Sequence, residues 1–127
     1  MNTLRILVIS FIVLSSSLSQ AEELKSCKAH PLVSGACFEF RGRLAFYNGT
    51  PSMRIWPIGT NRLLGISESK YFLQGYASIP STLVNKLKWG NAIYANFIAC
   101  PFAKQTPDTM QLICVESATN VQVKTWP

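Results

Sequence analysis

Two arginines and a tyrosine, followed closely by an arginine and a tryptophan, are the side chains of this sequence best suited to binding chemistry. Arg41, Arg43 and Tyr47 alternate with apolar residues, and Arg54 and Trp56 do the same a few residues later. Guanidinium groups interleaved with aromatic rings suit phosphate, carboxylate and sugar ligands, and they also suit stacked bases. The alternative is a solvated basic surface in which the arginine stems only cover the rings.

Residues that enzymes use for nucleophilic or acid–base catalysis are sparse. The single histidine, His30, precedes Pro31 in an irregular segment, so no Ser-His-Asp arrangement is indicated. We expect His30 to be a solvated surface residue. Glu39 and Glu116 are the carboxylates on expected strands, but Glu39 is more simply a partner for Arg41 or Arg43. There is also no phosphate-binding glycine loop. We therefore expect a protein that is not an enzyme and needs no cofactor. A hydrolase that uses Glu39 and Glu116 is the alternative, and it would require both carboxylates to point into a cleft.

Alternation of apolar and polar residues predicts short strands as the elements that position these side chains. Asn48-Gly49 predicts a turn that joins the first two strands as a hairpin, which would bring the five side chains named at the outset together on one outward face. The patterned segments are residues 37–47, 52–58, 62–66, 92–100 and 110–117, with a further short strand or ordered loop at 71–76 and a possible prolongation through Val121 and Val123.

A short helix is predicted between the third strand and the fourth. Pro80 opens it and Gly90 ends it. Gly42, on the inward side of the first strand, suggests a bend or a bulge. The order of three strands, a helix and two strands is that of the OB-fold, so we predict a mainly β, small, closed or partly open, OB-like barrel. A different small barrel or a β-sandwich is the alternative.

The N-terminal residues and the cysteines indicate an exported, disulfide-stabilised domain. Arg5, an apolar run and small residues up to Ala21 form the pattern of a cleaved signal peptide, which would leave residues 22–127 as a single β-barrel domain in the periplasm or outside the cell. The apolar run is too short to span a bilayer, and no transmembrane span is expected in the mature chain. An even cysteine count in such a domain predicts two disulfides, and the spacings do not fit a metal site. The cysteines are Cys27, Cys37, Cys100 and Cys114.

The pairing of these cysteines has two plausible solutions. In an OB-like barrel the first strand runs antiparallel to the fourth, so Cys37 would face Cys100 and Cys27 would pair with Cys114, which we favour slightly. The rival joins Cys27 to Cys37 and Cys100 to Cys114, but a simple hairpin puts Cys114 opposite about residue 96, too far from Cys100. A lipidated Cys27 is a further alternative, which Lys25 disfavours because lipoprotein signals carry a small residue there.

Several short motifs also support a family resemblance. They are Gly42-Arg43-Leu44, Asn48-Gly49-Thr50-Pro51-Ser52, Arg54-Ile55-Trp56, Ile58-Gly59-Thr60 and Leu64-Gly65-Ile66, followed by Cys100-Pro101-Phe102 and Cys114-Val115-Glu116-Ser117. In these motifs the chain resembles a set of small exported bacterial proteins of unassigned function. The resemblance implies a bacterial, periplasmic setting, and it assigns no catalytic or binding residue.

Charge and compartment together narrow the expected partners. The chain has 12 lysines and arginines against 6 aspartates and glutamates, a net charge of +6. This charge favours an anionic glycan, an anionic lipid or an acidic protein, and export disfavours nucleic acid. We predict a non-enzymatic binding module for anionic envelope ligands. The alternative is an inhibitor or accessory subunit that docks on a secreted or periplasmic enzyme through residues 59–62 or 104–109.

Overall fold

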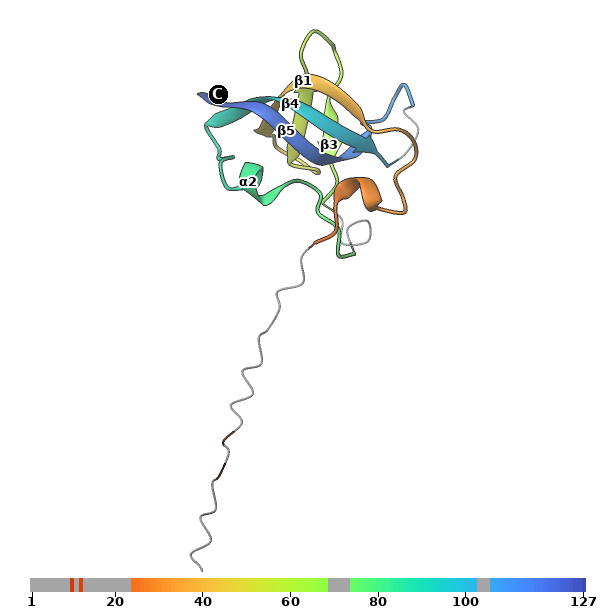
Figure 1. The fold of residues 1–127 in the computed structure, drawn as a ribbon. Coiled ribbons are helices and arrows are strands. Elements are labelled where there is room, and N and C mark those ends of the chain that lie inside the picture. Colours follow the sequence, from red (N-terminus) through yellow and green to blue (C-terminus); the bar gives the residue numbers. More distant parts are fainter. Residues whose placement is uncertain (1–9, 11, 13–23, 69–73, 103–105) are drawn as a thin grey trace, which may run out of the picture.

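The first strand pairs with two neighbours, and this pairing closes the sheet into a barrel. In the residues that the computed structural model describes, which are 10, 12, 24–68, 74–102 and 106–127, five strands form the ring β1-β2-β3-β5-β4. Neighbouring strands are antiparallel except β3 and β5, which run parallel. The strands, drawn in Figure 1, are β1 (Phe38–Phe46), β2 (Met53–Pro57), β3 (Leu64–Ile66), β4 (Asn91–Pro101) and β5 (Leu112–Thr125).

A short helix lies between β3 and β4, where the sequence predicts one. This helix, α2 (Ser81–Val84), is shorter than the pattern from Pro80 to Gly90 suggests. The strand order around the helix confirms the predicted mainly β, OB-like barrel. Among the described residues, no helix is long and apolar enough to cross a membrane. The predicted export signal and residues 71–73 of the segment 71–76 fall outside the described residues, so both stay predictions, while residues 74–76 form a turn and a single bridge from Tyr76 to Lys25.

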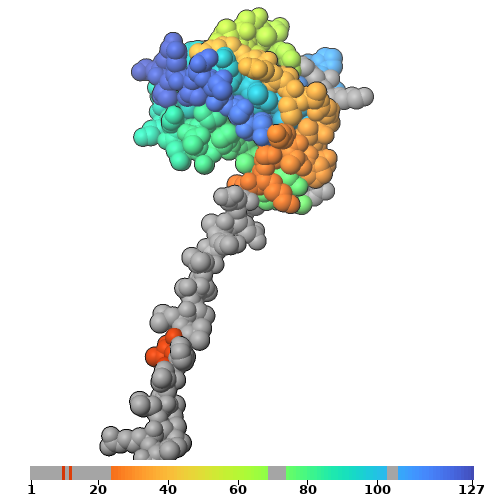
Figure 2. Space-filling view, viewed as in Figure 1, coloured from red at the N-terminus to blue at the C-terminus, as the bar shows by residue number. Residues whose placement is uncertain are grey.

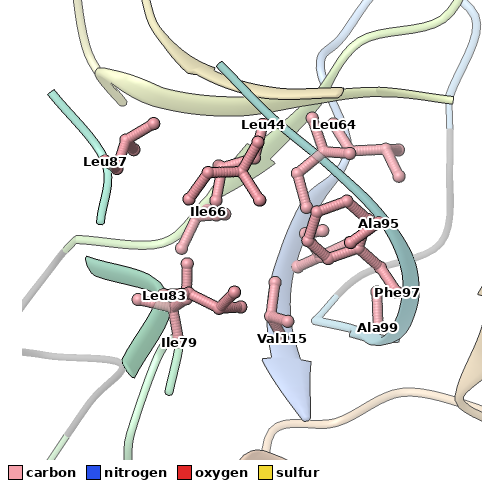
Figure 3. Close-up of a cluster of buried hydrophobic side chains, with 13 residues drawn as sticks. Leu44, Leu64, Ile66, Ile79, Leu83, Leu87, Ala95, Phe97, Ala99 and Val115 are labelled. Carbon is pink, nitrogen blue, oxygen red and sulfur yellow. The ribbon is translucent and has the colours of Figure 1, made fainter. Parts of the chain in front are cut away.

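Inward-facing side chains from all five strands fill the barrel, and residues around α2 close one end of it. Ile79, Leu83 and Leu87 reach the core from the segment that carries the helix (Figure 3). Burial of these apolar side chains is the main source of stability in a domain of this size. The strand residues of the core are Leu44, Ile55, Leu64, Ile66, Ile93, Ala95, Phe97, Ala99, Ile113 and Val115.

Gly42 lies on the inward side of β1, where no side chain would fit. A Cβ atom at this position would lie 2.6 Å from Ile55 Cγ2 and 2.9 Å from a ring carbon of Phe40. A bulge at Gly42 is wrong, because the register of β1 against both β2 and β4 runs through this residue without a shift. Glycine is therefore required by the close packing of its neighbours.

The last strand is longer than the apolar pattern alone predicts. β5 is 14 residues long, includes Val121 and Val123, and ends at Thr125. Its register against β4 shifts twice, between Tyr94 and Asn96 and again further along β4. The length of β5 matters for the site below, because it carries the C-terminal residues back across the barrel beside β4.

All four cysteines are described and paired, in the favoured connectivity. Cys27 bonds to Cys114 and Cys37 bonds to Cys100, with Cα–Cα distances of 5.7 and 4.2 Å. The argument used against the rival is wrong, however. Cys100 lies directly opposite Cys114 in the β4–β5 register, and yet the two sulfurs bond elsewhere.

The disulfides also settle two alternatives for the cysteines. Cys27 is buried and its sulfur is bonded, so a lipidated Cys27 is wrong. The sulfurs of Cys27, Cys100 and Cys114 lie within 4.8 Å of one another, but all three are disulfide-bonded. Metal ions bind the thiolate form, so this group is structural.

His30 is buried, which corrects the expectation of a solvated residue. It follows η1 (Cys27–Ala29), a 3₁₀ turn that the Cys27–Cys114 bond ties to the barrel. Its ring lies 4.6 Å from the ring of Tyr76 and 5.0 Å from that of Phe102, and its Nδ1 accepts the Leu32 N–H at 3.0 Å. The irregular lead-in has its own small aromatic cluster, which sequence periodicity does not reveal.

Candidate ligand-binding face

Arg43 is at the centre of a row of outward-facing residues that crosses three strands. Its partner in the register of β2 is Trp56, and its partner in the register of β4 is Tyr94. Residues directly opposite one another share a face of the sheet. The Arg43 guanidinium carbon lies 4.7 Å from the centroid of the Trp56 ring, so the predicted meeting of Arg43 and Trp56 is confirmed.

Trp126, near the C-terminus, contacts the same guanidinium. The Arg43 guanidinium carbon lies 4.7 Å from the centroid of the Trp126 ring, so the cation is flanked by two indoles, one from β2 and one from the C-terminus. The Trp126 backbone N–H donates to the Gly90 carbonyl at 3.1 Å, and the centroid of the indole lies 5.5 Å from that of the Tyr47 ring. Figures 1 and 2 show the C-terminal residues, in blue, beside β1.

Two small residues make room for Trp126. Ala45 lies between Arg43 and Tyr47 along the outward side of β1, and Trp126 contacts both of these neighbours. Ala92 lies one residue before Ile93, which is the β4 residue at the end of the pairing with β1. Both alanines are fully buried although the alternation directs them outward. The indole therefore covers this part of the strand, and a larger residue in place of Ala45 would displace it.

Arg54 connects the face to the loop between β1 and β2. Its guanidinium carbon lies 5.4 Å from the centroid of the Tyr47 ring. Its Nε donates to the Pro51 carbonyl at 2.8 Å, and its Nη2 donates to the Asn48 carbonyl at 3.2 Å. Arg54 thus holds the predicted hairpin loop with two of the five N–H donors of a guanidinium, and the others are left for solvent or a ligand.

Arg41 is one of the predicted site residues, but it belongs to a different set of contacts. Its Nη1 donates to Asn96 Oδ1 at 3.3 Å and to the Asn120 carbonyl at 3.1 Å. These bonds link β1 to β4 and β5. The expected pairing of Glu39 with Arg41 or Arg43 is not found among the described residues, since the two guanidinium groups have the partners given above.

The resulting surface, which we call the cation–aromatic face, has a permanent positive charge. Burial lowers the pKa of Arg43, but hydrogen bonds with Tyr47 and Tyr94 outweigh this effect and raise the pKa above its usual value. The Lys124 ammonium adds a second cation 5.0 Å from the centroid of the Tyr94 ring. Lys124 is exposed and the other members are half-buried: Arg43, Tyr47, Arg54, Trp56, Tyr94 and Trp126.

Tyr94, Lys124 and Trp126 are the members that the sequence analysis did not assign to the site. Alternation along β4 directs Ile93 inward and Tyr94 outward, so the outward position of Tyr94 could have been predicted from the sequence. The position of Trp126 could not have been predicted, because it depends on the full length of β5 and on the register shifts of β5 against β4.

OB-folds commonly use the outer surface of the second and third strands for ligands, but here the chain itself covers β3 at Gly65. A Cβ atom on Gly65 would lie 2.6 Å from Pro51 Cγ and 2.8 Å from Met110 Sδ. The Glu68 carboxylate fixes the loop that carries Pro51, because it accepts the backbone N–H and the hydroxyl of Ser52 at 3.1 and 2.7 Å. The cation–aromatic face therefore shares only β2 and its loop with that usual surface, and it is centred on β1 instead.

A hollow of about 410 Å³ lies between the loop before β3 and the loop before β5. Arg62 Nη2 donates to Gln111 Oε1 at 3.0 Å on its wall, and Asp108 contributes the opposite charge. Both loops named in the docking alternative reach this hollow, as far as they are described. Its lining residues are Asn61, Arg62, Leu63, Leu64, Pro107, Asp108, Thr109, Met110 and Gln111.

Comparisons of the chain with protein-family models, with curated proteins and with solved structures found no significant match. Function must therefore be inferred from the residues themselves.

Proposed function

We propose that the protein is a non-enzymatic module that binds anionic glycans through the cation–aromatic face. The observation that carries this proposal is the contact of the Arg43 guanidinium with Trp56 and Trp126 on a half-exposed surface, with Arg54 and Lys124 nearby. Indole and phenol rings offer apolar surfaces on which the C–H faces of sugar rings pack. Guanidinium and ammonium groups pair with carboxylate, phosphate or sulfate substituents.

The distribution of charge supports an anionic ligand. Residues 74–102 and 117–127, which supply β4, most of β5 and the C-terminus, contain no aspartate or glutamate. Guanidinium groups stay protonated at any physiological pH, so binding should not depend on pH near neutrality. Because the cations are close to solvent, binding should weaken as the salt concentration rises.

The location proposed for this activity is outside the cytoplasm, in the periplasm or beyond the cell. Two disulfides are suited to an oxidising compartment, and anionic glycans are available in a bacterial envelope. The export pattern of the first 21 residues supports the same location.

A charge reversal with a matched control tests the proposal. Lys124→Glu should weaken binding to dextran sulfate about fivefold, which corresponds to about 1 kcal/mol for an exposed ion pair. Lys28→Glu makes the same change in net charge at an exposed position within η1 and should change binding less than about twofold. Isothermal titration calorimetry, with neutral dextran as the blank, measures both. Equal weakening by the two variants would mean that only net charge matters, and the proposal would fail.

The ring contribution needs a separate variant. Trp56→Leu keeps an apolar side chain at the position and removes the flat indole. We expect weaker binding to dextran sulfate, with a far-UV circular dichroism spectrum like that of the parent. Unchanged affinity in this variant would remove the aromatic part of the proposal.

A second candidate function is docking on an enzyme as an inhibitor or accessory subunit. The observation in its favour is the hollow where the two loops of that alternative meet, with Arg62 and Asp108 on its wall. A stoichiometric complex from envelope extract that forms with the parent and Lys124→Glu, and is lost with Arg62→Ala, would favour docking over glycan binding.

A further inference from the structure

Trp89 is an exposed aromatic side chain whose position is nevertheless fixed. It is 66% exposed, and it lies in the turn between α2 and β4. Its ring stacks on that of Phe46, with centroids 5.4 Å apart and an interplanar angle of 25°. An indole held out at the rim of a barrel costs free energy in water, since it leaves a large apolar surface hydrated.

A single asparagine holds the backbone of the two lysines that precede Trp89. Asn91 Oδ1 accepts the backbone N–H of Lys88 at 2.8 Å, and Asn91 Nδ2 donates to the carbonyl of Lys86 at 3.1 Å. Both lysines are exposed. The turn therefore presents an ordered Lys-Leu-Lys-Trp segment, in which Leu87 reaches the core.

The C-terminal part of β5 extends this edge. Asn91 pairs with Thr125 and Ile93 pairs with Val123, so the end of β5 runs beside the start of β4. In the view of Figure 1, the end of β5, the start of β4 and α2 lie on the same side of the molecule. We call this surface the Trp89 edge, and its exposed residues are Val84, Lys86, Lys88, Trp89, Val123 and Lys124.

We propose that the Trp89 edge binds the surface of an anionic lipid bilayer, with the Trp89 indole at the level of the headgroups. Tryptophan is the side chain most enriched at membrane–water interfaces, and lysines beside an anionic surface strengthen adsorption. The segments that build this edge contain no acidic side chain to oppose them.

A bilayer fits this edge better than a protein partner does. The centre of a protein interface is depleted in charged residues, and lysine is among the residues most depleted there. Here exposed lysines lie beside exposed apolar side chains along the edge. That mixture suits an interface in which indole and valine side chains enter the apolar boundary while the ammonium groups meet lipid phosphates.

This inference does not depend on the proposed glycan binding, because Lys124 is the only residue shared by the two surfaces. Variants of the other residues can therefore test it alone. The protein, with both disulfides formed, is mixed with vesicles of phosphatidylglycerol and phosphatidylcholine in equal parts, and bound protein is measured by sedimentation at low salt. Vesicles of phosphatidylcholine alone should bind much less.

The charge test compares two double variants that remove the same charge. Lys86→Gln with Lys88→Gln should reduce binding to the anionic vesicles by about 25-fold, at about fivefold for each lysine near the surface. Lys25→Gln with Lys28→Gln removes two exposed lysines from the N-terminal lead-in and should reduce binding less than about threefold. Equal losses in the two double variants would overturn the proposal.

The insertion test uses a conservative ring change, so that the contact with Phe46 is kept. Brominated phosphatidylglycerol should quench part of the tryptophan fluorescence of the parent, and Trp89→Phe should remove that quenched part. Trp89→Phe should bind dextran sulfate as the parent does, which separates this result from the glycan proposal. Undiminished quenching in Trp89→Phe, or no binding of the parent to anionic vesicles, would overturn the proposal.

Discussion

The contact between Arg43 and Trp126 is expected to contribute measurably to the stability of the barrel. Trp126→Ala removes one cation–π contact and one ring contact with Tyr47, and it uncovers Ala45. A cation–π contact at a partly exposed site contributes about 0.5–1 kcal/mol, and an aromatic pair about 0.5–1.5 kcal/mol. With some apolar area exposed in addition, the free energy of unfolding should fall by about 2 kcal/mol.

A double-mutant cycle isolates the part of this effect that belongs to the pair. Arg43→Met keeps most of the aliphatic stem and removes the charge. If the contact stabilises the barrel, the double variant, Arg43→Met with Trp126→Ala, should lose less free energy of unfolding than the two single variants lose together, by about 1 kcal/mol. The measurement is urea unfolding followed by circular dichroism, with both disulfides intact. Circular dichroism is preferred because the substitution removes one of the three tryptophans that fluorescence would report.

The matched control is a cycle between Arg43 and Trp89. Trp89 stacks on Phe46 and is not among the ring contacts of Arg43, so the losses in Arg43→Met and Trp89→Ala should add within about 0.5 kcal/mol. Additive losses in the Trp126 cycle as well would show that the guanidinium and the indole are only neighbours. The explanation of the face as one coupled cluster would then be wrong.

Three further predictions concern the core, the disulfides and the mature terminus. Gly42→Ala should lower the free energy of unfolding by about 1–3 kcal/mol in urea, because its Cβ would lie 2.6 Å from Ile55; unchanged stability would mean that the barrel yields easily there. Peptide mapping of the unreduced protein should recover the two disulfides described above, and a peptide that joins Cys100 to Cys114 would contradict the structure. Mass measurement of the protein from its natural source should give a chain that starts at or near Glu22, whereas an intact first residue in a soluble cytoplasmic fraction would rule out export.

Most of the barrel could be predicted from the sequence because its signals are local. Alternation along β1, β2 and β4 depends only on which face is buried, and the Asn48-Gly49 turn reports a hairpin within a few residues. The position of the helix between the third and fourth strands then favoured the OB-like order of strands. The same local reasoning found Arg43 and Trp56, since they are opposite one another across that hairpin.

The features that could not be predicted depend on contacts between distant parts of the chain. Cys100 faces Cys114 because of where the β4–β5 connection turns, which no apolar pattern records. His30 is buried by rings that follow it by many residues, Tyr76 and Phe102. Trp126 reaches Arg43 only because β5 continues past its apolar half. In each case the residue type was visible, but its partner was set by register or by chain length.

The two proposed surfaces meet at the C-terminus, and this geometry has a consequence for the ligand. The Trp126 backbone N–H donates to the carbonyl of Gly90, the residue next to Trp89, so the cation–aromatic face adjoins the Trp89 edge. A protein held on a bilayer by Trp89 would keep Arg43 and Trp56 beside the headgroups. An anionic glycan attached to a lipid would then meet both surfaces at once, and the second contact would be made at a high effective concentration. A soluble glycan would meet only one surface, so the two proposals together predict tighter binding of a ligand in which anionic sugars and lipid belong to the same molecule.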